Sequence, residues 1–577
     1  DIYKMFDKMM IMDTGGYPVY YGPPVEAVTY FKSASNQVGA EKGQCQTCGN
    51  VNPEQIFNII EAKVVDEYGE FTNKRKVTPV QWKALYDTNF EPENIEEINE
   101  LPPRSLKIPS KIKQSIIFAK RDLLSKLSNK QYMLINLLEA PLLAFILAFL
   151  IRYKSGPEGQ EYIFRFNENI PVYIMMAIII ALFMGLTVSA EEIIKDRKIL
   201  KRESFLNLSW NSYLLSKVFI LFALSAIQTI IFTLIGNLIL EIHGMTLTYW
   251  LVLFSISCTA NVIGLNISSA FNSAVTVYIL IPLLIIPQMV LSGLLFNFDK
   301  LNEIVSTKGK VPIVADLMAS RWGYEGIAVR QFITNEYESK FYEFEKDELQ
   351  ADFKSSYWVK ELKSRINYAI DNINTNDKER LDKVNRYLAL VKLELIEDAG
   401  ENVVQDIDLN VALDPDRFNA QIGQEIIKYL DHLFKKYLDQ YNLAVQKKEK
   451  LIYGYENTFK YDLSDMKDNY YNESLADLVR NLTVKNRVIE FKGRLLQIVD
   501  PVFNEPKNPK HLLDYRTHFF APKKHLFGSY FDTYWFNFTV IWAMTLLLYI
   551  ALYFEWLKKI IGSFEDIGKK FKKKDSN

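Results

Sequence analysis

The sequence contains little cysteine or histidine and no excess of either charge. Three cysteines in 577 residues, Cys45, Cys48 and Cys258, exclude a small fold held together by several disulfides. The 68 lysines and arginines are balanced by 69 acidic residues, so nothing at whole-chain level indicates a nucleic-acid partner. No secretory signal peptide opens the chain, and the stretch after Asp1 reads like the middle of a domain, so we expect a fragment of a longer protein.

Complete ligand sets for a metal or a nucleotide are also missing. Cys45-x-x-Cys48 could be half of a zinc site, but a structural site needs four ligands, which favours an ordinary loop with reduced thiols. His511 and His518 with Asp514 could indicate another metal, although their isolation favours a surface role. We therefore predict no metal site. No Gly-x-x-x-x-Gly-Lys-Ser/Thr phosphate loop occurs, so this chain alone is not expected to hydrolyse ATP.

Long apolar segments are the strongest positive feature. Six stretches approach or reach the roughly 20 residues that a helix needs to cross the hydrocarbon core of a membrane. The second, IPVYIMMAIIIALFMGLTVSA, contains no charge, whereas a buried helix of a soluble protein normally keeps a polar face. We therefore predict a mainly α, polytopic membrane protein. Its six transmembrane helices are expected at 133–151, 170–190, 218–240, 249–267, 275–296 and 535–554.

Lysine and arginine near the ends of these segments predict the orientation. Basic clusters precede the first segment, separate the second from the third and follow the sixth, whereas the link EIHGMTLT between the third and fourth contains neither residue. We expect both termini in the cytoplasm, 297–534 outside the cell and a multi-pass location in the inner (plasma) membrane. The clusters are Lys111, Lys113, Lys120, Arg121, Lys126 and Lys130; Lys195, Arg197, Lys198, Lys201 and Arg202; and Lys558, Lys559, Lys569, Lys570, Lys572, Lys573 and Lys574.

The N-terminal residues 1–103 combine short strands with helices. MIMDTGGYPVYYG predicts two strands joined at Thr14-Gly15-Gly16, and PVEAVTYFKSA a short amphipathic helix. IYKMFDKMMIMDTGGYPVYYGPPVEAVTYF, followed by CQTCGNVNPEQIFNII, resembles the end of the nucleotide-binding domain of G-subfamily (white/pleiotropic drug resistance type) ABC transporters. The resemblance implies that 1–103 is the C-terminal tail of such a domain. It also implies that ATP and Mg are bound by the full-length protein rather than by this chain alone.

Two charged segments beside the membrane continue this resemblance. KIKQSIIFAKRDLLSKLSNKQY, within 104–130, is an amphipathic pattern that corresponds to the connecting helix of the family. AEEIIKDRKILKRESFLNLSWNSYLLSK, between the second and third spans, resembles its coupling helix, which docks on the ATPase domain. A solvated run of charges is the alternative interpretation. The positions that correspond to the coupling helix are Glu191, Glu192, Arg197, Arg202 and Glu203.

The resemblance extends through about 1–335 and 511–556, so 131–300 would hold spans one to five and 535–556 span six. CTANVIGLNISSAFNSAVTVYILIPLLIIPQMVLSG is similar to spans four and five of the family. DLMASRWGYEGIAVRQF, in which Arg321, Trp322, Tyr324 and Glu325 match, resembles the re-entrant segment, assigned here to 301–335.

In the family two copies face each other, and substrate passes between their second and fifth spans. The resemblance therefore implies a homodimer in contact with membrane lipid. Since helix rotation is not fixed by one sequence, the same residues could face lipid instead. The candidate path residues are Ile178, Phe183, Met184, Ile286, Met289, Val290 and Leu291.

Asn136 and Glu139 are polar residues inside the first predicted span. A carboxylate there costs roughly 2–3 kcal/mol on insertion scales, so it should face protein or water. Glu139 is either a contact important for gating or, as we favour, a residue near the cytoplasmic interface that bonds to the connecting helix.

The segment 336–510 matches no family that we can name. Helical spacing of Val384, Leu388, Val391 and Leu395, and of Ile426, Leu430, Leu433 and Leu438, predicts a large helical external domain. It contains no cysteine, which favours a bacterial-type protein whose domain faces the periplasm. Residues 511–534 would return the chain to the membrane, and 557–577 would form a basic cytoplasmic tail.

These observations predict the permease part of an ATP-driven ABC exporter that moves a hydrophobic or amphipathic substrate outward. The alternative is a mechanotransmission protein that drives a periplasmic partner through 336–510. A membrane scaffold without ATPase is a third class, and it requires that the gene begin at Asp1.

Overall fold

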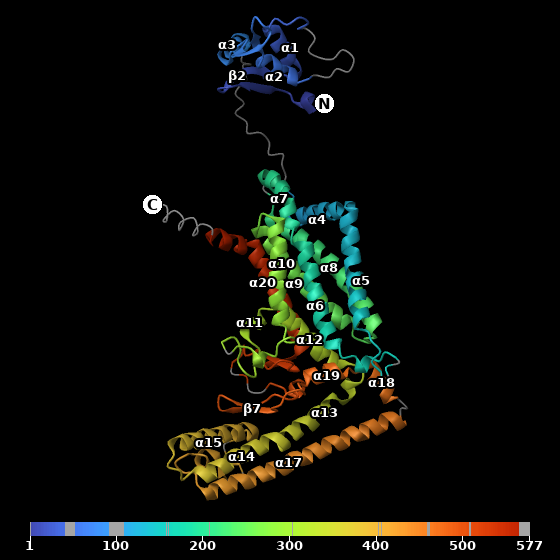
Figure 1. Ribbon diagram of the computed structural model, residues 1–577, viewed down its shortest axis with the longest axis vertical. Helices are drawn as coiled ribbons and strands as arrows, with labels where there is room; N and C mark the ends of the chain where they lie inside the picture. The colour runs from blue at the N-terminus through green and yellow to red at the C-terminus, as the bar shows by residue number, and fades with distance from the viewer. Residues whose placement is uncertain are drawn as a thin grey trace. The chain divides into compact units, whose positions relative to one another are not determined.

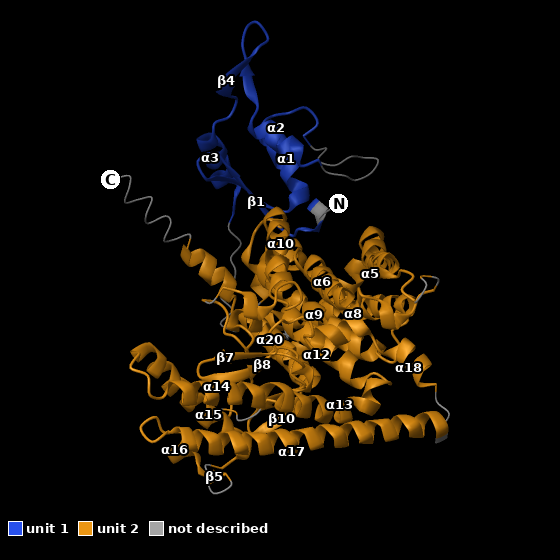
Figure 2. Cartoon of the chain, turned by 60° about the horizontal axis from the view of Figure 1, so that its bottom comes forward, with its two compact units in different colours: residues 1–107 blue, residues 108–577 orange. Residues whose placement is uncertain are grey.

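The computed structural model describes residues 2–40, 52–91 and 109–564, apart from short gaps at 157–158, 160, 207, 303, 402, 405–406, 459–461, 507–508 and 510. Two compact units cover 1–107 and 108–577 (Figure 2). Cys45 and Cys48, the first residues of the predicted connecting segment at 104–108, and the basic tail from 565 onward lie outside the described residues.

The first unit contains the predicted hairpin and helix. Strands β1 (Met9–Asp13) and β2 (Tyr17–Gly22) pair antiparallel, and Gly15 and Gly16 adopt φ of 93° and 81° in the turn, as predicted. Helix α1 (Pro24–Ala34) covers the inner face of the hairpin, where Val19 and Phe31 are buried. The remaining elements are the 3₁₀ turn Ile2–Met5, α2 (Glu54–Ile60), β3 (Lys63–Val65), β4 (Phe71–Arg75) and α3 (Pro79–Asn89).

The second unit is built around a helix bundle (Figure 1). Among its described residues, five helices are long and apolar enough to cross a membrane, which confirms the polytopic α-helical fold. They are α5 (Lys130–Ile151), α6 (Ile170–Ser189), α8 (Trp210–Leu240), α9 (Thr246–Ala270) and α20 (Thr533–Tyr553).

The helix at the fifth predicted span is shorter than the sequence suggested. Helix α10 (Ala274–Val290) has 17 residues and ends before the predicted limit at residue 296. Pro282 and Pro287 remove two backbone donors from it, and Gly293 turns the chain with φ of 94°. At about 1.5 Å per residue the helix is about 25 Å long, slightly less than the hydrocarbon core.

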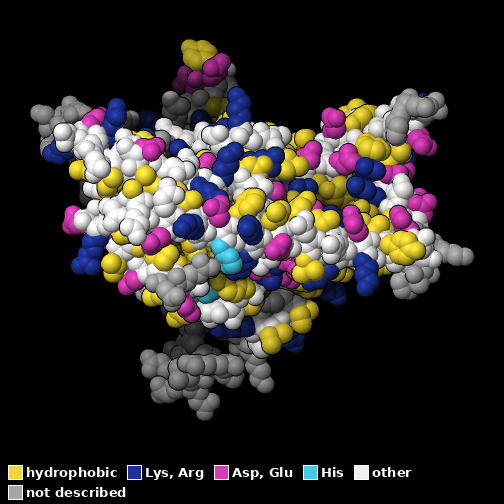
Figure 3. All heavy atoms as spheres, turned by 90° about the horizontal axis from the view of Figure 1, so that it is seen from below, with side chains coloured by type: hydrophobic (Ala, Val, Ile, Leu, Met, Phe, Trp, Pro, Cys, Tyr) yellow, Lys and Arg dark blue, Asp and Glu magenta, His cyan; other side chains and the backbone are white. Residues whose placement is uncertain are grey.

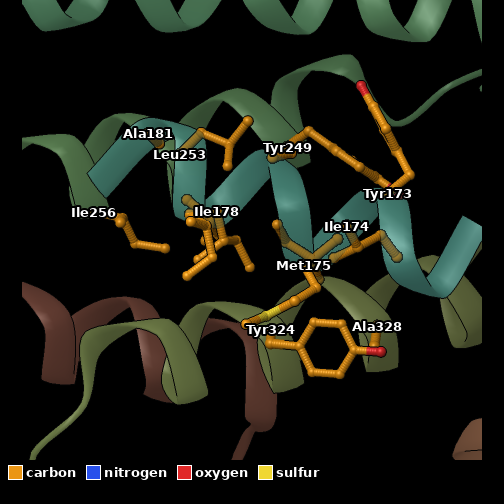
Figure 4. Packing of buried hydrophobic residues seen from close by; sticks show 14 of the residues in the cluster. Tyr173, Ile174, Met175, Ile178, Ala181, Tyr249, Leu253, Ile256, Tyr324 and Ala328 are labelled. Carbon is orange, nitrogen blue, oxygen red and sulfur yellow. The ribbon is translucent and has the colours of Figure 1, made fainter. Parts of the chain in front are cut away.

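Helices α6 and α9 pack along each other, and both contact α12 (Ala319–Thr334); Figure 4 shows buried side chains where these helices meet. Close approach depends on small residues, since a Cβ atom at Gly185 would lie 2.5 Å from the backbone oxygen of Ser257. The Tyr173 and Tyr249 rings stack with centroids 6.3 Å apart. Apolar side chains from three helices thus share one buried core.

The bundle has two distinct ends. We call the end with α4 (Lys111–Ser128) and α7 (Glu192–Glu203) the α7 end, and the opposite one the α12 end. Leu552, in the last turn of α20, packs in one cluster with Phe118 of α4 and Tyr213 of α8. The described parts of all three predicted basic clusters therefore lie at the α7 end.

Beyond the α12 end, a mainly helical domain has its own hydrophobic core. Val384, Leu388, Ile426 and Leu430 are buried in it, as their helical spacing predicted, whereas Leu438 is exposed. Its helices are α13 (Glu338–Asp352), the π-helical turn Phe353–Trp358, α14 (Val359–Asn372), α15 (Lys378–Ala399), α16 (Leu409–Ala412), α17 (Ala420–Tyr453), the π-helical turn Gly454–Thr458, α18 (Leu463–Tyr470) and α19 (Glu473–Val479).

Short hairpins complete this side of the protein, and they were not predicted. They are β5 (Val403–Val404) with β6 (Ile407–Asp408), β7 (Val488–Phe491) with β8 (Arg494–Gln497), and β9 (Lys523–Leu526) with β10 (Ser529–Asp532). Other short helices are Phe164–Phe166, Ser204–Leu206, Phe298–Lys300, α11 (Ile313–Asp316) and Pro501–Phe503. Figure 3 shows basic, acidic and apolar side chains mixed over the outer face of this side.

Glu338, at the start of α13, is a buried acid. Its carboxylate oxygens are inaccessible and accept no hydrogen bond from the described residues. Burial, with a contribution from Glu345, raises the pKa of Glu338 to about 9. Since this exceeds the unfolded value of about 4.3, the folded state binds more protons between these pH values, and the free energy of unfolding falls as the pH rises through this window.

We therefore expect Glu338→Gln to stabilise the protein at pH 8 by about 3–5 kcal/mol, because the amide needs no proton uptake on folding and each pKa unit between the unfolded value and the working pH is worth about 1.4 kcal/mol. At pH 4 the two proteins should be about equally stable. Detergent-induced unfolding at both pH values measures this difference. Glu343→Gln is the control, because the Glu343 side chain is 74% exposed; an equal gain from both variants would contradict the prediction.

Candidate coupling sites at the two ends of the helix bundle

A compact charge cluster joins three helices at the α7 end. The Nζ atom of Lys217, on α8, lies 3.0 Å from Glu192 Oε2 and 2.9 Å from Asp196 Oδ2 on α7, and it also pairs with Asp122 on α4. Lys126 Nζ lies 2.6 Å from Asp122 Oδ2 and 2.7 Å from Glu192 Oε2. We call these five residues the coupling cluster.

Burial makes the coupling cluster a structural constraint rather than a surface feature. The Lys217 side chain is only 4% exposed, and the Tyr213 hydroxyl donates to Asp196 at 3.0 Å. Burial acts to raise the pKa of Asp122, but Lys217 and Lys126 more than offset this effect, so that its pKa lies below the usual value. Asp122 therefore stays ionised, and the placement of three carboxylates around two lysines fixes α4 and α7 against α8.

The two ends of α7 are held by further contacts. The Ser268 hydroxyl, near the end of α9, accepts hydrogen bonds from the backbone N–H groups of Ile193 (3.0 Å) and Ile194 (3.2 Å). Arg197 donates to the backbone carbonyls of Ser268 and Ser269, which lie in the last turn of α9 and lack an intrahelical donor. Near the other end of α7, Arg121 NH1 lies 2.7 Å from Glu203 Oε1.

The structure separates the predicted coupling residues into two groups. Glu192, Arg197 and Glu203 bind other helices of the bundle, as described above. Glu191 pairs with Lys195 within the same segment at 2.8 Å, and Arg202 is exposed. The free surface of α7 is therefore mainly basic, and it consists of Lys195, Lys198, Lys201 and Arg202.

The helix α4 has one face toward the bundle and one away from it. Phe118 is buried, and Gln114 accepts a hydrogen bond from the Ser209 backbone N–H at 2.9 Å. The opposite face is apolar and exposed, as expected for a helix that lies in a membrane interface. Its residues are Ile112, Ile116, Ile117, Leu123, Leu124 and Leu127.

A second buried charge cluster lies at the α12 end. Glu325 of α12 accepts from Lys524 Nζ of β9 at 2.9 Å and from Asn537 Nδ2 of α20 at 2.9 Å. Arg321 NH1 lies 3.4 Å from Glu325 Oε2 and 3.7 Å from Asp316 Oδ1. These residues, the α12 cluster, connect the segment before α12, α12 itself, β9 and the start of α20.

Both ions of the central pair in the α12 cluster are removed from water, since Glu325 is 0% and Lys524 1% exposed. Burial lowers the pKa of Lys524 to about 8, although Glu325 opposes that effect. Burial raises the pKa of Asp316, against the opposing effect of Arg321 and Arg516. At neutral pH Lys524 therefore remains a cation, and the pair is ionic.

The candidate path residues differ in exposure. Ile178 and Met184 are buried in the core between α6 and its neighbours, whereas Phe183 and Ile286 are exposed. Met289, Val290 and Leu291 are half-buried. Their role in a path therefore stays a prediction, and Phe183 and Ile286 are the ones whose side chains are free for it in this chain.

The intramembrane polar residues also occupy different environments. Asn136 is buried, donates to the Tyr132 carbonyl at 2.8 Å, and its own carbonyl accepts from Gln228 on α8 at 3.0 Å. Glu139 is half-buried, and no hydrogen bond or ion pair joins it to another described residue. Both predicted roles of Glu139, a contact important for gating and a bond to the connecting helix, therefore stay predictions.

The histidines that suggested a metal do not converge on one site. His511 is exposed, and the His518 ring bonds to the Pro501 carbonyl at 2.9 Å. Asp514 lies 3.7 Å from Lys310. Within the described residues, no group of three or more histidine, cysteine or acidic side chains could hold a metal ion.

A comparison with protein families gives a match for most of the helix bundle. Residues 113–329 match the ABC-2 type transporter model. The matched segment runs from α4 to α12 and so contains the coupling cluster and most of the α12 cluster. This match supports an ABC-2 type permease domain in this segment, and its apolar helices indicate a multi-pass membrane protein. No curated protein matches the chain.

Sequence reasoning missed several residues of the two clusters in this permease domain. Lys217 was placed just outside the third predicted span, but α8 begins at Trp210, so Lys217 lies two turns inside a helix. Asp122 and Lys126 have the i, i+4 spacing of a helical ion pair, which was a usable signal. Lys524 and Asn537 had no such signal, because their partner Glu325 is about 200 residues away in the chain.

Proposed function

We propose that this chain is the permease part of an ATP-driven ABC exporter of the G-subfamily type. It works as a homodimer in the inner membrane, with both termini cytoplasmic, and moves a hydrophobic or amphipathic substrate outward. ATP and Mg are bound by the ATPase part of the full-length protein or complex. The observation that carries the proposal is the coupling cluster of the ABC-2 type domain, because it fixes α4 and α7 to α8 as one charged block.

Two features support an ATPase partner. The basic free surface of α7 offers charges that can set the register of a docked domain. In the first unit, the outer face of the hairpin exposes Met10, Met12, Tyr17 and Tyr21, so this small fold leaves apolar surface uncovered. Such a surface suits the interior of a larger domain, in agreement with the proposed nucleotide-binding tail.

Movement of α7 must then reach the substrate path. Ser268 and Arg197 attach α7 to the end of α9, and α9 packs along α6. A displacement of α7 would shift α9 and α6 together, because packed helices move as rigid elements. Phe183 on α6 and Ile286 on α10 are the exposed side chains of the proposed path.

The ion pair between Arg121 and Glu203 tests this transmission. We expect Glu203→Lys to lower ATP-dependent export of lipophilic dyes from inverted vesicles by about 5-fold or more, as for loss of a typical coupling energy. The protein should still reach the membrane, because this pair is partly exposed and contributes only about 1 kcal/mol to stability.

The exchanged pair Arg121→Glu with Glu203→Arg is the matched variant, and it should recover most of the export. Export by Glu203→Lys at the level of the unchanged protein would contradict the coupling role of this pair.

A second candidate function, transmission of motion to a periplasmic partner, is favoured by a clamp between the bundle and the external domain. Asn472 Nδ2 donates to the carbonyls of Phe164 (2.8 Å) and Asn167 (2.9 Å) in the link between α5 and α6. Arg165 in the same link pairs with Asp468 at 3.2 Å and with Glu473 at 2.6 Å. Bundle motion would therefore pull on α18 and α19.

We expect Asn472→Ala to destabilise this junction by about 1–3 kcal/mol, since buried carbonyls lose their donor and α19 loses the N-cap bond from the Leu475 N–H to Asn472 Oδ1. Amide hydrogen exchange in 463–480 should accelerate, while exchange in α17 stays unchanged. Ser474→Ala is the control, because its hydroxyl makes one exposed hydrogen bond to the Glu168 carbonyl.

Deletion of 340–505 distinguishes the two functions. An exporter would retain ATPase activity stimulated by substrate, and a transmission protein would lose its output.

A further inference from the structure

The membrane helix α20 is followed, after two residues, by a short helix at 556–564. Glu555 separates the two, since its φ of 51° lies in the left-handed region and cannot continue a right-handed helix. Its backbone N–H donates to the Leu552 carbonyl at 3.1 Å and closes α20, while its carbonyl accepts from the Lys559 N–H at 3.0 Å and starts the new helix. The chain therefore changes direction at Glu555, and Figure 1 shows the short helix at an angle to α20.

Helix 556–564 is divided lengthwise into an apolar and a polar face. With 3.6 residues per turn, its apolar side chains fall within an arc of about 140°. They are Trp556, Leu557, Ile560, Ile561 and Phe564. Lys558, Lys559 and Ser563 occupy the opposite side and are exposed. The helix thus has the pattern of a helix that lies along the surface of a membrane.

Much of the apolar face is uncovered. Leu557 packs against the hydrophobic core of the bundle, but Trp556, Ile560 and Phe564 form an exposed stripe with a spacing of four residues. Helix α17 of the external domain exposes four large apolar side chains over 34 residues, whereas helix 556–564 exposes three over nine. Its outer stripe is therefore far more apolar than the surface of a helix in the external domain.

The helix begins at the level of the bundle where α4 lies. Leu552, in the last turn of α20, belongs to one cluster with Phe118 of α4, and the outer face of α4 is also apolar and exposed. Between this cluster and the short helix, the exposed rings of Phe554 and Trp556 stack with centroids 6.2 Å apart. Exposed tryptophan at the end of a membrane helix is typical of the lipid–water interface. Two amphipathic helices thus mark the same boundary at the α7 end.

The charges near this stripe have a net positive sign. From 553 to 564 the charged residues are Glu555, Lys558 and Lys559. Lys558 Nζ lies 3.1 Å from Glu555 Oε1, so these two charges offset each other and Lys559 supplies the excess. Cations opposite an apolar stripe can reach phosphate groups while the stripe contacts acyl chains.

We propose that helix 556–564 docks on anionic lipid headgroups in the leaflet at the α7 end. It lies along the interface, with Trp556, Ile560 and Phe564 against the acyl chains and with Lys558 and Lys559 among the phosphates. Its position directly after a membrane helix, and its continuity with the exposed aromatic end of α20, favour lipid over a soluble partner. This inference concerns the anchoring of α20 in the membrane and does not depend on the substrate or on ATP coupling.

The test places an NBD fluorophore at Ile560→Cys in the full chain. Cys45→Ser and Cys48→Ser remove two thiols, and Cys258 is buried. The protein is reconstituted in nanodiscs of equal parts phosphatidylcholine and phosphatidylglycerol, with a nitroxide on the acyl chain of one lipid or of the other. Because the nitroxide quenches only nearby fluorophores, the two preparations report which lipid lies beside the helix. Both leaflets have the same composition, so the result does not depend on the orientation of the protein.

Three further positions serve as references, and their native side chains are all exposed. Leu546→Cys on α20 reports the membrane span, Leu443→Cys on α17 reports the aqueous domain, and Ser563→Cys reports the polar face of the same helix. We expect the label at 560 to be quenched as strongly as the label at 546, and several-fold more than the labels at 563 and 443.

Quenching at 560 by the nitroxide on phosphatidylglycerol should exceed quenching by the nitroxide on phosphatidylcholine by about 2- to 5-fold, because one net positive charge beside an anionic surface favours it by up to roughly 5-fold. Lys559→Gln should remove this difference and leave the total quenching in place. Equal quenching by both lipids in the unchanged helix would overturn the proposal.

Quenching at 560 no stronger than at 443 would also overturn it. Emission that matches the label at 443 would then indicate a helix in water. Emission at shorter wavelength would indicate a contact with protein, including a second copy of this chain.

Discussion

Lys217→Met should lower the free energy of unfolding by about 3–5 kcal/mol, the usual result of removing one partner of a buried ion pair. The substitution leaves Asp122, Glu192 and Asp196 around a single cation, Lys126, in a site where Lys217 itself is 4% exposed. Repulsion between the carboxylates should then loosen α4 and α7 from α8. Detergent-induced unfolding of the purified chain measures the loss.

A matched pair of variants identifies the cause. Adding Glu192→Gln to Lys217→Met removes one of the repelling carboxylates, so more than half of the lost stability should return. Lys195→Met on α7 is the control; its side chain is 60% exposed and pairs only with Glu191, and we expect a change of about 0.5 kcal/mol or less. If Lys195→Met and Lys217→Met were equally damaging, the coupling cluster would not be the constraint that we infer.

Lys524→Met should cost a similar amount, about 3–5 kcal/mol, because Glu325 would remain as a buried carboxylate without its closest cation. Arg321, at 3.4 Å, offsets only part of the loss. The effect should appear at the junction of α12, β9 and α20. Amide exchange in 319–334 and 533–540 should accelerate, and unfolding in detergent should shift to a lower concentration.

The neighbouring lysine gives an internal control. Lys523 is 42% exposed and pairs with Glu505 at 3.0 Å, so Lys523→Met should change stability by less than about 1 kcal/mol. The double variant Glu325→Gln with Lys524→Met should regain most of the stability, since a neutral amide replaces the isolated charge. Failure of the double variant to recover would show that the packing of Lys524, and not its charge, holds the junction.

The two clusters also lie at opposite ends of the helix bundle, where either proposed function would require the domain to receive and to pass on a displacement. The coupling cluster joins helices at the α7 end, and the α12 cluster joins α12 and α20 to β9 at the opposite end. Helices α6 and α9 share contacts with α12 as well as with each other, so the two ends are connected through packed side chains. This arrangement suits either proposed function, because both need one end to respond to the other.

The sequence by itself determined the features that depend on local composition. Runs of apolar residues identified all six bundle helices, and Gly15-Gly16 identified the first hairpin, because hydrophobicity and turn conformation are properties of neighbouring residues. The basic residues correctly grouped at one end, since an even number of crossings returns the chain to the same side. Helical spacing also identified buried positions such as Val384 and Leu388 in the external domain.

Only the tertiary structure decided which face of each helix is buried and which charges meet. Ile178 and Met184 turn into the core because α6 packs on α9 through Gly185, a rotation that composition alone does not fix. Lys217 pairs with Asp122, which is 95 positions away in the sequence, and Lys524 pairs with Glu325, which is 199 positions away. Such pairs form because a buried charge is stable only beside an opposite charge. The separation of two residues in the sequence does not show whether the fold brings them together.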